Sequence, residues 1–211
     1  MNLAEILRLA PVIPVLTIDQ LKDAVPLARA LVKGGLPVIE VTLRTGAGLQ
    51  AIRAIADEVP EAVVGAGTVL TEAQFDKVVA AGAQFAVSPG ATGHLLDAVS
   101  DREVQLLPGI ATASEAMALI ERGYEFAKLF PAEAVGGVAL LSALAAPLPH
   151  VKFCPTGGVT LENAPKYLKL PNVVCVGGSW MVPRAAIAAS DWDGLTMAAS
   201  AAAALHVHRT P

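Results

Sequence analysis

Residues Glu125–Glu133 read EFAKLFPAE, and the inner part of this run is apolar except for one lysine, Lys128. If the run is a β-strand, Phe126, Lys128 and Phe130 share one face, because side chains alternate between the two sides of a strand. Burial between two phenyl rings disfavours an ammonium, and a neutral amine can attack a ketone to form a Schiff base. The alternative is that Lys128 extends its head group to water at the end of the strand.

Short apolar runs of this kind recur along the chain, each followed by a segment with helical character. The expected strands are Val12–Leu16, Pro37–Leu43, Ala62–Gly65, Phe85–Val87, Val104–Leu107, Glu125–Phe130, Val151–Cys154 and Val173–Val176. The expected helices are Asn2–Ala10, Gln20–Lys33 capped by Asp19, Ala47–Glu58, Glu72–Ala81 capped by Thr71, Thr92–Val99, a helix from Thr112 or Ser114 to Arg122, Gly137–Leu144, Leu161–Leu168, Pro183–Ala189 and Asp191–Leu205.

Alternating strands and helices imply a parallel sheet with right-handed crossovers. Eight such units predict a closed α/β architecture, the (β/α)8 TIM barrel, with an additional N-terminal helix and C-terminal helix. An open doubly wound sheet is the alternative. The dinucleotide fingerprint GxGxxG does not follow the first strand, so a nucleotide-binding fold of that kind lacks its signature.

Length and composition favour a single cytoplasmic domain, residues 1–211. Apolar residues make up 54% and charged residues 16% of the chain, so we expect other subunits to cover some apolar surface. A net charge of −4 provides no basic field for nucleic acid or anionic membranes. Cys154 and Cys175 lack metal-ligand spacing and are expected to be buried free thiols, as in a reducing compartment. We find no signal peptide, and the Ala-rich run Met197–Leu205 is too short to cross a bilayer.

The second expected strand carries three polar residues, Glu40, Thr42 and Arg44, on one face. In a βα barrel the reactive groups lie at the carboxyl ends of the strands. Glu40 and Arg44 could form a buried ion pair along this strand, since buried charges are normally paired. Alternatively, Glu40 is a general acid/base that meets Lys128 inside the barrel. Arg44 would then be free to bind a substrate carboxylate through its planar guanidinium.

Two glycine pairs follow the last two expected strands, in Thr156-Gly157-Gly158 and in Gly177-Gly178-Ser179. Loops at these positions of βα barrels often bind phosphate. Glycine lets the backbone approach an anion closely, and successive N–H groups form an anion-binding nest. Each pair could instead mark a tight turn only, but two pairs in neighbouring loops favour a phosphate site.

Several other residues have more than one interpretation. Thr68 ends the third strand. Pro89 either lines a pocket or only forms a turn, and Phe130 either packs in the core or lines a pocket beside the Lys128 amine. Lys152 is the rival nucleophile because it also lies on a strand. The histidines have no carboxylate partners at metal-binding spacing, so we predict no metal site at His94, His150, His206 or His208.

Seven motifs, in order between about Pro11 and Pro183, carry a resemblance to a known family. They are Glu40–Thr45 (EVTLRT), Val64–Val69 (VGAGTV), Phe85–Gly90 (FAVSPG), Leu107–Ile110 (LPGI), Lys128–Glu133 (KLFPAE), Phe153–Val159 (FCPTGGV) and Val176–Trp180 (VGGSW). In this combination the chain resembles the bacterial 2-keto-3-deoxy-6-phosphogluconate (KDPG) and 4-hydroxy-2-oxoglutarate aldolases, which are class I pyruvate aldolases.

The resemblance implies a role for each matching residue. Lys128 would form the Schiff base and Glu40 would be the general acid/base, while Arg44 and Thr68 would hold the pyruvate carboxylate. Pro89 and Phe130 would line the pocket. The distal phosphate would be held by Thr156, Gly157, Gly158, Gly178 and Ser179. The resemblance also implies a homotrimer that needs no metal or organic cofactor, because the lysine replaces the Lewis acid.

The implied substrate is a phosphorylated keto acid, KDPG, cleaved to pyruvate and glyceraldehyde 3-phosphate in the Entner-Doudoroff pathway, with 4-hydroxy-2-oxoglutarate as a second substrate. Mild departures from the family pattern at Ala91, Gly93-His94 and Leu129 bear on substrate breadth. The alternatives are a related aldolase specific for the galactonate epimer or for 4-hydroxy-2-oxoglutarate, and a non-catalytic phosphosugar-binding barrel.

Overall fold

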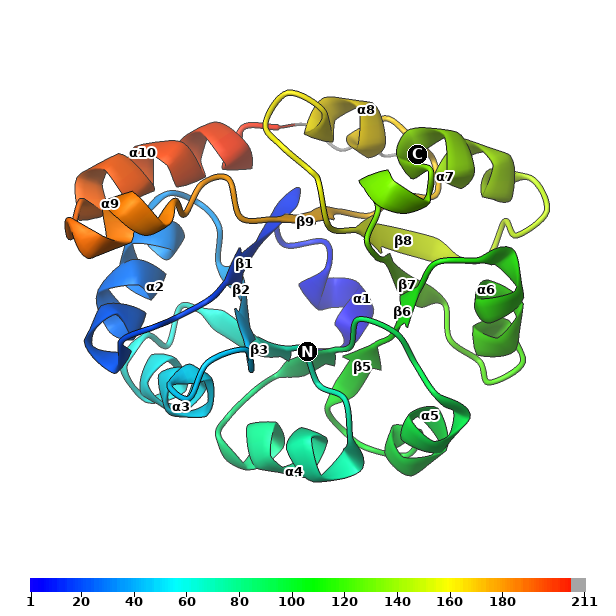
Figure 1. Ribbon diagram of the computed structural model, residues 1–211, viewed down its shortest axis with the longest axis horizontal. Coiled ribbons are helices and arrows are strands. Elements are labelled where there is room, and N and C mark those ends of the chain that lie inside the picture. The colour runs from blue at the N-terminus through cyan, green and yellow to red at the C-terminus, as the bar shows by residue number, and fades with distance from the viewer. Residues whose placement is uncertain (206–211) are drawn as a thin grey trace.

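The computed structural model describes residues 1–205, and it forms a ring of parallel strands surrounded by helices (Figure 1). His206 and His208 lie outside the described residues. The strands are β1 (Val12–Leu16), β2 (Val38–Thr42), β3 (Val63–Gly67), β4 (Phe85–Val87), β5 (Gln105–Leu107), β6 (Gly109–Ile110), β7 (Phe126–Leu129), β8 (Lys152–Pro155) and β9 (Val176–Gly178).

The ring is assembled from two pieces of sheet, ordered β5-β4-β3-β2-β1-β9 and β6-β7-β8. Pro108 alone separates β5 from β6, and its carbonyl still accepts a hydrogen bond from Lys128 N at 2.8 Å, so β5 and β6 occupy one position. On the other side, parallel bridges Phe153–Val173 and Thr156–Gly177 join β8 to the chain at β9. The predicted closed barrel is therefore confirmed, and the open doubly wound alternative is wrong.

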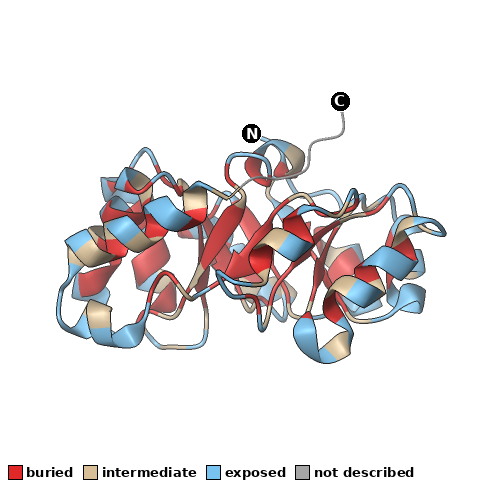
Figure 2. Ribbon diagram, turned by 90° about the horizontal axis from the view of Figure 1, so that it is seen from above, coloured by how far each residue is buried: buried red, intermediate tan, exposed pale blue. Residues whose placement is uncertain are grey.

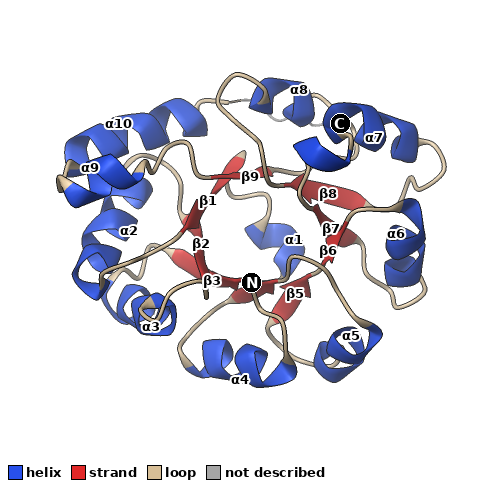
Figure 3. Ribbon diagram, viewed as in Figure 1, coloured by secondary structure: helices blue, strands red, loops and turns tan. Residues whose placement is uncertain are grey.

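Helices cover the outside of the ring, whereas α1 projects within it (Figure 3). The helices are α1 (Leu3–Ile6), α2 (Ala24–Lys33), α3 (Gly48–Glu58), α4 (Glu72–Ala80), α5 (Gly93–Val99), α6 (Ala113–Ile120), α7 (Gly137–Ala145), α8 (Ala164–Leu168), α9 (Arg184–Ala188) and α10 (Trp192–Ala203), with 3-10 turns η1 (Leu21–Asp23) and η2 (Glu133–Val135). Within residues 1–205, none of these helices has the length and apolarity to cross a membrane.

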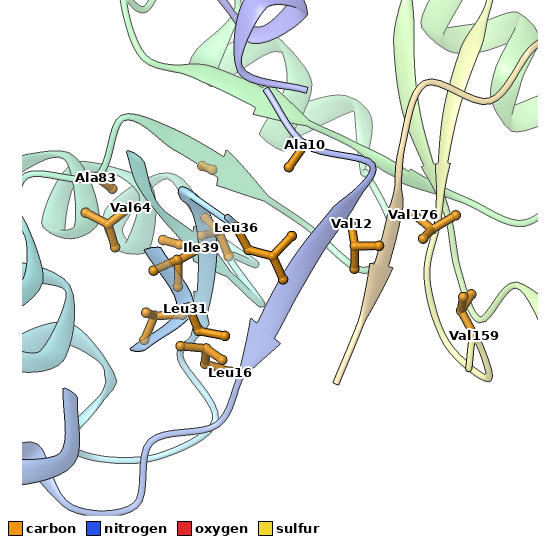
Figure 4. Close-up of a cluster of buried hydrophobic side chains, with 14 of the residues drawn as sticks. Ala10, Val12, Leu16, Leu31, Leu36, Ile39, Val64, Ala83, Val159 and Val176 are labelled. Atoms are coloured by element: carbon orange, nitrogen blue, oxygen red, sulfur yellow. The ribbon is translucent and has the colours of Figure 1, made fainter. Parts of the chain in front are cut away.

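The core has two layers because strand side chains alternate between the inside and the outside of the ring. Outside, strand residues such as Leu16 and Ile39 pack against helix residues such as Leu31, part of which Figure 4 shows. Inside, α1 closes the amino-terminal end of the barrel. Its apolar residues join the inner residues of the strands in one cluster: Leu3, Ile6, Leu7, Ile13, Val38, Val63, Phe85, Val87, Leu107, Cys154 and Cys175. Figure 2 shows these buried strands between the partly exposed helices, with α1 at one end.

Two helices begin later than predicted, and a proline explains each case. Pro26 has no N–H, so it fits only in the first turn of a helix, and α2 accordingly begins at Ala24 rather than at Gln20. The expected cap at Asp19 is wrong for the same reason. Pro165 likewise places the start of α8 at Ala164 rather than at Leu161.

Two other segments differ in extent from their predictions. The N-terminal helix covers Leu3–Ile6 instead of Asn2–Ala10, because the chain tightens into a final turn with Arg8 N donating to Glu5 O at 3.2 Å. The last strand is β9, Val176–Gly178, instead of Val173–Val176. Its glycine pair therefore pairs with β1 as part of the barrel wall, and only Ser179 follows the strand.

Candidate active site

Lys128 and Glu40 meet inside the barrel. They come from β7 and β2, which lie on opposite sides of the ring (Figure 1). Lys128 Nζ donates a hydrogen bond to Glu40 Oε1 at 3.2 Å, and each side chain is only 4% exposed. The interpretation that Lys128 extends to water is therefore wrong.

Strand periodicity explains why these two side chains point inward. On β2, Val38 lies in the inner cluster and Ile39 in the outer one, so Glu40 faces inward again. On β7, Phe126 packs against the inner cluster and Ala127 lies in the outer one, so Lys128 faces inward. The pair sits above the apolar cluster that α1 closes, where each charge is compensated by the other.

Gly67, a residue that the sequence analysis did not single out, provides the space for the carboxylate. A Cβ atom at Gly67 would lie 2.1 Å from Glu40 Oε1, which is far closer than any van der Waals contact. A glycine is therefore required on β3 beside Glu40. Its place at the end of the motif VGAG was the only available signal in the sequence.

Arg44 and Thr68 lie together just beyond the ends of β2 and β3. Arg44 Nε donates to Thr68 Oγ1 at 3.2 Å, and Thr68 adopts a positive φ of 62°. Within residues 1–205, Arg44 forms no ion pair with a carboxylate, so the alternative of a Glu40–Arg44 pair is wrong. The remaining guanidinium N–H groups of this exposed arginine are oriented by the threonine contact and are suited to a bound carboxylate.

Pro89 and Phe130 follow β4 and β7 and are both half-buried. Lys128 Nζ lies 5.3 Å from the centroid of the Phe130 ring, which makes this ring a neighbour of the amine. The backbone of Pro89 packs closely on β6, because a Cβ at Gly109 would lie 2.3 Å from the Pro89 carbonyl carbon. Gly109 is thus a strand residue in close contact with the backbone of Pro89.

The turn after β8 has the backbone conformation that a phosphate nest needs. Gly157 and Gly158 have φ values of +97° and +81°, which side-chain-bearing residues rarely adopt. The Gly157 carbonyl accepts from Glu133 N and the Gly158 carbonyl from Asn163 Nδ2, at 3.1 and 3.0 Å. Within the described part of the chain, the N–H groups of the two glycines donate to no protein acceptor. They are therefore available to an anion.

The second predicted phosphate segment lies beside this turn. Thr156 is buried and bridges to Gly177, while Ser179 is exposed at the end of β9. Gly178 is required because a Cβ there would lie 1.9 Å from the Trp180 ring. The structure thus brings both glycine pairs to neighbouring positions at the carboxyl ends of the strands.

A cleft of about 230 Å³ opens next to Ser179, and it includes two polar residues that the sequence analysis did not assign, Thr17 and Arg184. Arg184 Nε lies 3.9 Å from Asp19 Oδ2, and its side chain is largely exposed. No motif pointed to Arg184, because it lies on a helix that follows the last strand. Its position nevertheless adds a cation to the mouth of the barrel beside Ser179.

Lys152, the rival nucleophile, lies at the wrong end of the barrel. It begins β8 opposite Phe126, whereas Lys128 lies opposite Cys154 nearer the carboxyl end. Lys152 Nζ donates to the carbonyl of Pro171, in the segment that precedes β9, at 3.1 Å. Geometry therefore leaves Lys128 as the lysine of the inner site.

The two cysteines are free and buried, as predicted. Their hydrogen bond, together with burial, holds the pKa of the Cys175 thiol well above its ordinary value. The Cys175 thiol therefore remains protonated and adds no charge beneath the Lys128–Glu40 pair. Among residues 1–205, no cluster of three or more His, Cys, Asp or Glu side chains has the arrangement of a metal site.

Comparison with known proteins gives long, high-identity matches. The family model of KDPG and KHG aldolase matches residues 3–198. The 2-dehydro-3-deoxy-phosphogluconate aldolase of Pseudoalteromonas atlantica is 54% identical over 194 residues, covering 92% of this chain and 90% of that protein. The KHG/KDPG aldolase of Escherichia coli is 53% identical over 191 residues, covering 90% of each.

A solved structure extends the similarity to three dimensions. The KDPG aldolase of Legionella pneumophila, with pyruvate captured as a covalent carbinolamine intermediate, superposes with a TM-score of 0.95. It is 47% identical, and the superposition covers 97% of this chain and 99% of that chain. With a family match over most of the sequence and relatives more than half identical, the chain belongs to the KDPG and KHG aldolase family.

Proposed function

We propose that this protein is a class I aldolase that cleaves KDPG to pyruvate and glyceraldehyde 3-phosphate, and that it also acts on 4-hydroxy-2-oxoglutarate. The observation that carries the proposal is the buried contact of 3.2 Å between Lys128 Nζ and Glu40 Oε1 at the carboxyl ends of the barrel strands. The amine and the acid/base group that Schiff-base chemistry requires are thereby adjacent and shielded from water.

The first half of the reaction forms the covalent intermediate. Lys128 passes a proton to Glu40, and the neutral amine attacks the C2 ketone to give a carbinolamine. Protonated Glu40 returns its proton to the departing hydroxyl group, so that water leaves and a protonated imine remains. The imine nitrogen is bonded to C2 and carries the positive charge that the next step consumes.

The second half breaks the carbon–carbon bond. Glu40, now a carboxylate, takes the proton of the C4 hydroxyl, directly or through a water molecule. The C3–C4 electron pair moves toward the protonated imine, so glyceraldehyde 3-phosphate leaves and the pyruvate enamine forms. Glu40 then returns the proton to C3, and water hydrolyses the imine to release pyruvate and restore Lys128.

The two ends of the substrate are held by different groups. Arg44 and Thr68 bind the pyruvate carboxylate, with Pro89 and Phe130 lining the space between. The phosphate lies on the neighbouring glycine segments, bound by Thr156, Gly157, Gly158, Gly178 and Ser179, with Arg184 as an additional nearby cation. Fixing both ends orients C2 toward Lys128, and orientation of this kind contributes several kcal/mol to catalysis.

The proposed mechanism is tested by trapping. The protein is incubated with pyruvate and borohydride, digested and mapped by mass spectrometry. We expect a mass increase equal to one reduced pyruvate on the peptide that contains Lys128. An adduct on Lys152, or no adduct, would contradict the mechanism.

Side-by-side rates on three substrates test the specificity. The glycine segments support a phosphorylated substrate, so KDPG should be cleaved faster than 4-hydroxy-2-oxoglutarate at equal concentration. If the galactonate epimer of KDPG is cleaved faster than KDPG, the protein is instead an aldolase specific for that epimer. A non-catalytic phosphosugar-binding barrel has no need of a buried Lys128–Glu40 pair, and binding without pyruvate release in a coupled assay would revive it.

We also propose a homotrimer that works in the cytoplasm. Apolar side chains that remain exposed on the single chain support association; they include Leu9, Leu21, Leu70, Met117, Leu161 and Met197. Light scattering during size-exclusion chromatography measures the molar mass. A value of one chain's mass, rather than three, would contradict the trimer.

A further inference from the structure

Glu133 and Tyr167 lie behind the Gly157–Gly158 turn, and the proposed mechanism uses neither of them. Glu133 begins η2, which follows β7, and Tyr167 is on α8, which follows β8. The Tyr167 hydroxyl donates a hydrogen bond to Glu133 Oε1. Because the tyrosine is fully buried while the glutamate is exposed, the contact ties a surface segment to a fixed point in the core.

The segment that contains Glu133 also holds the backbone of the turn. Ala132 N donates to Thr156 O at 2.8 Å, and Glu133 N donates to Gly157 O at 3.1 Å. These two bonds fix the carbonyl groups that precede the N–H groups of Gly157 and Gly158. The direction of those N–H groups is thereby set from the η2 side.

The side chain of Glu133 fills the space directly behind the turn. A Cβ at Gly158 would lie 2.6 Å from Glu133 Cγ, so the turn packs on the stem of the glutamate. On its other side, a Cβ at Gly137 would lie 2.7 Å from the Tyr167 hydroxyl oxygen and 3.0 Å from Glu133 Oε1. Glycines on both sides thus accommodate the Tyr167–Glu133 contact.

The Tyr167 hydroxyl keeps the proton that it donates to Glu133. Burial, followed by the hydrogen bond to Glu133, raises the pKa of the Tyr167 phenol well above its ordinary value. The Tyr167 hydroxyl therefore stays protonated at neutral pH and remains a hydrogen-bond donor.

We propose that Glu133 and Tyr167 form a positioning pair that holds the Gly157–Gly158 turn in its anion-binding shape and so sets the preference for phosphorylated ligands. The inference rests on the proposed function of this turn as the phosphate site. Neither residue touches the reacting atoms. Their effect should be confined to the phosphate end, because Lys128 and Glu40 are held by β7 and β2.

The test compares Tyr167→Phe, which removes only the hydroxyl, with Tyr124→Phe as the matched control. These are the two tyrosines of the chain, and Tyr124 lines a separate cleft with Asn2 and Leu3 at the amino-terminal end of the barrel. Calorimetry measures the binding of glycerol 3-phosphate. We expect Tyr167→Phe to weaken it about five- to tenfold, the effect of losing one charge-assisted hydrogen bond that orders a site. Tyr124→Phe should leave it unchanged.

Steady-state kinetics on two substrates distinguish a positioning role from a merely structural one, because general destabilisation would affect both substrates. Tyr167→Phe should raise the KM for KDPG by a similar factor and leave kcat/KM for 4-hydroxy-2-oxoglutarate within about twofold of wild type. Glu133→Gln keeps the side-chain shape and an acceptor oxygen, so it should retain most of the phosphate affinity. Glu133→Ala removes the acceptor from the exposed side and should reproduce the loss even if Tyr167→Phe fails to fold.

Failure of this inference is distinguishable from failure of the proposed function. A Lys128 adduct with pyruvate, combined with unchanged glycerol 3-phosphate binding in Tyr167→Phe and Glu133→Ala, overturns the positioning pair and leaves the aldolase intact. Equal losses on both substrates also overturn it, as does wild-type protein that binds no glycerol 3-phosphate. If glycerol 3-phosphate binding depends on Tyr167 but pyruvate forms no adduct with Lys128, the positioning pair is supported and the catalytic proposal is contradicted.

Discussion

Lys128 Nζ and Glu40 Oε1 are 3.2 Å apart, although 88 residues separate them in sequence. Their contact depends on ring closure, because β7 and β2 belong to different pieces of the sheet and face each other across the barrel. Each side chain is also the only partner with which the other forms an ion pair within residues 1–205. The same contact therefore bears on both stability and chemistry.

Breaking this pair from one side should destabilise the protein and abolish cleavage. Lys128→Met removes the nucleophile and leaves Glu40 buried without a counter-charge, at a cost of about 3–5 kcal/mol in the free energy of unfolding. Adding Glu40→Gln should recover part of the stability but no activity. Urea unfolding and a coupled pyruvate assay measure the two effects. Additive stability losses in the double variant would contradict the pairing.

Glu40→Gln alone separates acid/base catalysis from binding. The amide keeps the shape of the carboxylate but cannot carry protons, so kcat should fall by about 10²–10⁴-fold while the KM for KDPG changes little. Steady-state kinetics give both constants. A variant with near wild-type kcat would show that another group moves the protons.

Gly67→Ala should impair catalysis by displacing the carboxylate. Its Cβ would overlap Glu40 Oε1, and a misplacement of about 1 Å can cost on the order of 10²-fold in rate. Gly46→Ala is the matched control, because a Cβ at Gly46 meets nothing within 4 Å. The rate of borohydride trapping with pyruvate compares the two variants. Equal rates would mean that Glu40 has room to relocate.

The sequence predicts the barrel and the inward direction of the pair because both follow from local periodicity. Alternation of two along PVIEVTL and EFAKLF places Glu40 and Lys128 on the same face as their inner apolar neighbours. Helix starts were less predictable near prolines. The apolar pattern predicted earlier starts for α2 and α8, but Pro26 and Pro165 fit only in the first turn of a helix and so fix where each helix begins.

Local spacing left two partners open for Glu40, namely Arg44 along its own strand and Lys128 across the barrel. Which of the two pairs with Glu40 depends on how the ring closes. The requirement for Gly67 and the position of Arg184 also depend on distances between separate strands and helices. Periodicity assigns a residue to a face, whereas the contacts across the barrel depend on how the strands close.

Arg184 should contribute long-range attraction for the phosphate end of the substrate. We expect Arg184→Ala to raise the KM for KDPG by about two- to fivefold at low ionic strength, with a smaller effect at high salt because an exposed charge is screened. The KM for the unphosphorylated substrate should change less. Lys33→Ala, which removes another exposed cation paired with Asp193, serves as the control. The same rise in both variants would indicate a general charge effect.

The N-terminal cap of α6 should make the free energy of unfolding depend on pH in the acid range. Ala111 N donates to the Glu115 carboxylate at 2.7 Å, and this bond, together with those from Thr112, holds the pKa of Glu115 below its ordinary value of 4.5. Because the folded pKa is depressed, the stabilisation is present above pH 4.5 and is lost as the pH falls through the folded pKa. Glu115→Gln should therefore be less stable than wild type at pH 7, and the difference should narrow toward pH 3. Urea unfolding at the two pH values tests this, and a constant difference would show that the carboxylate acts by shape alone, without its charge.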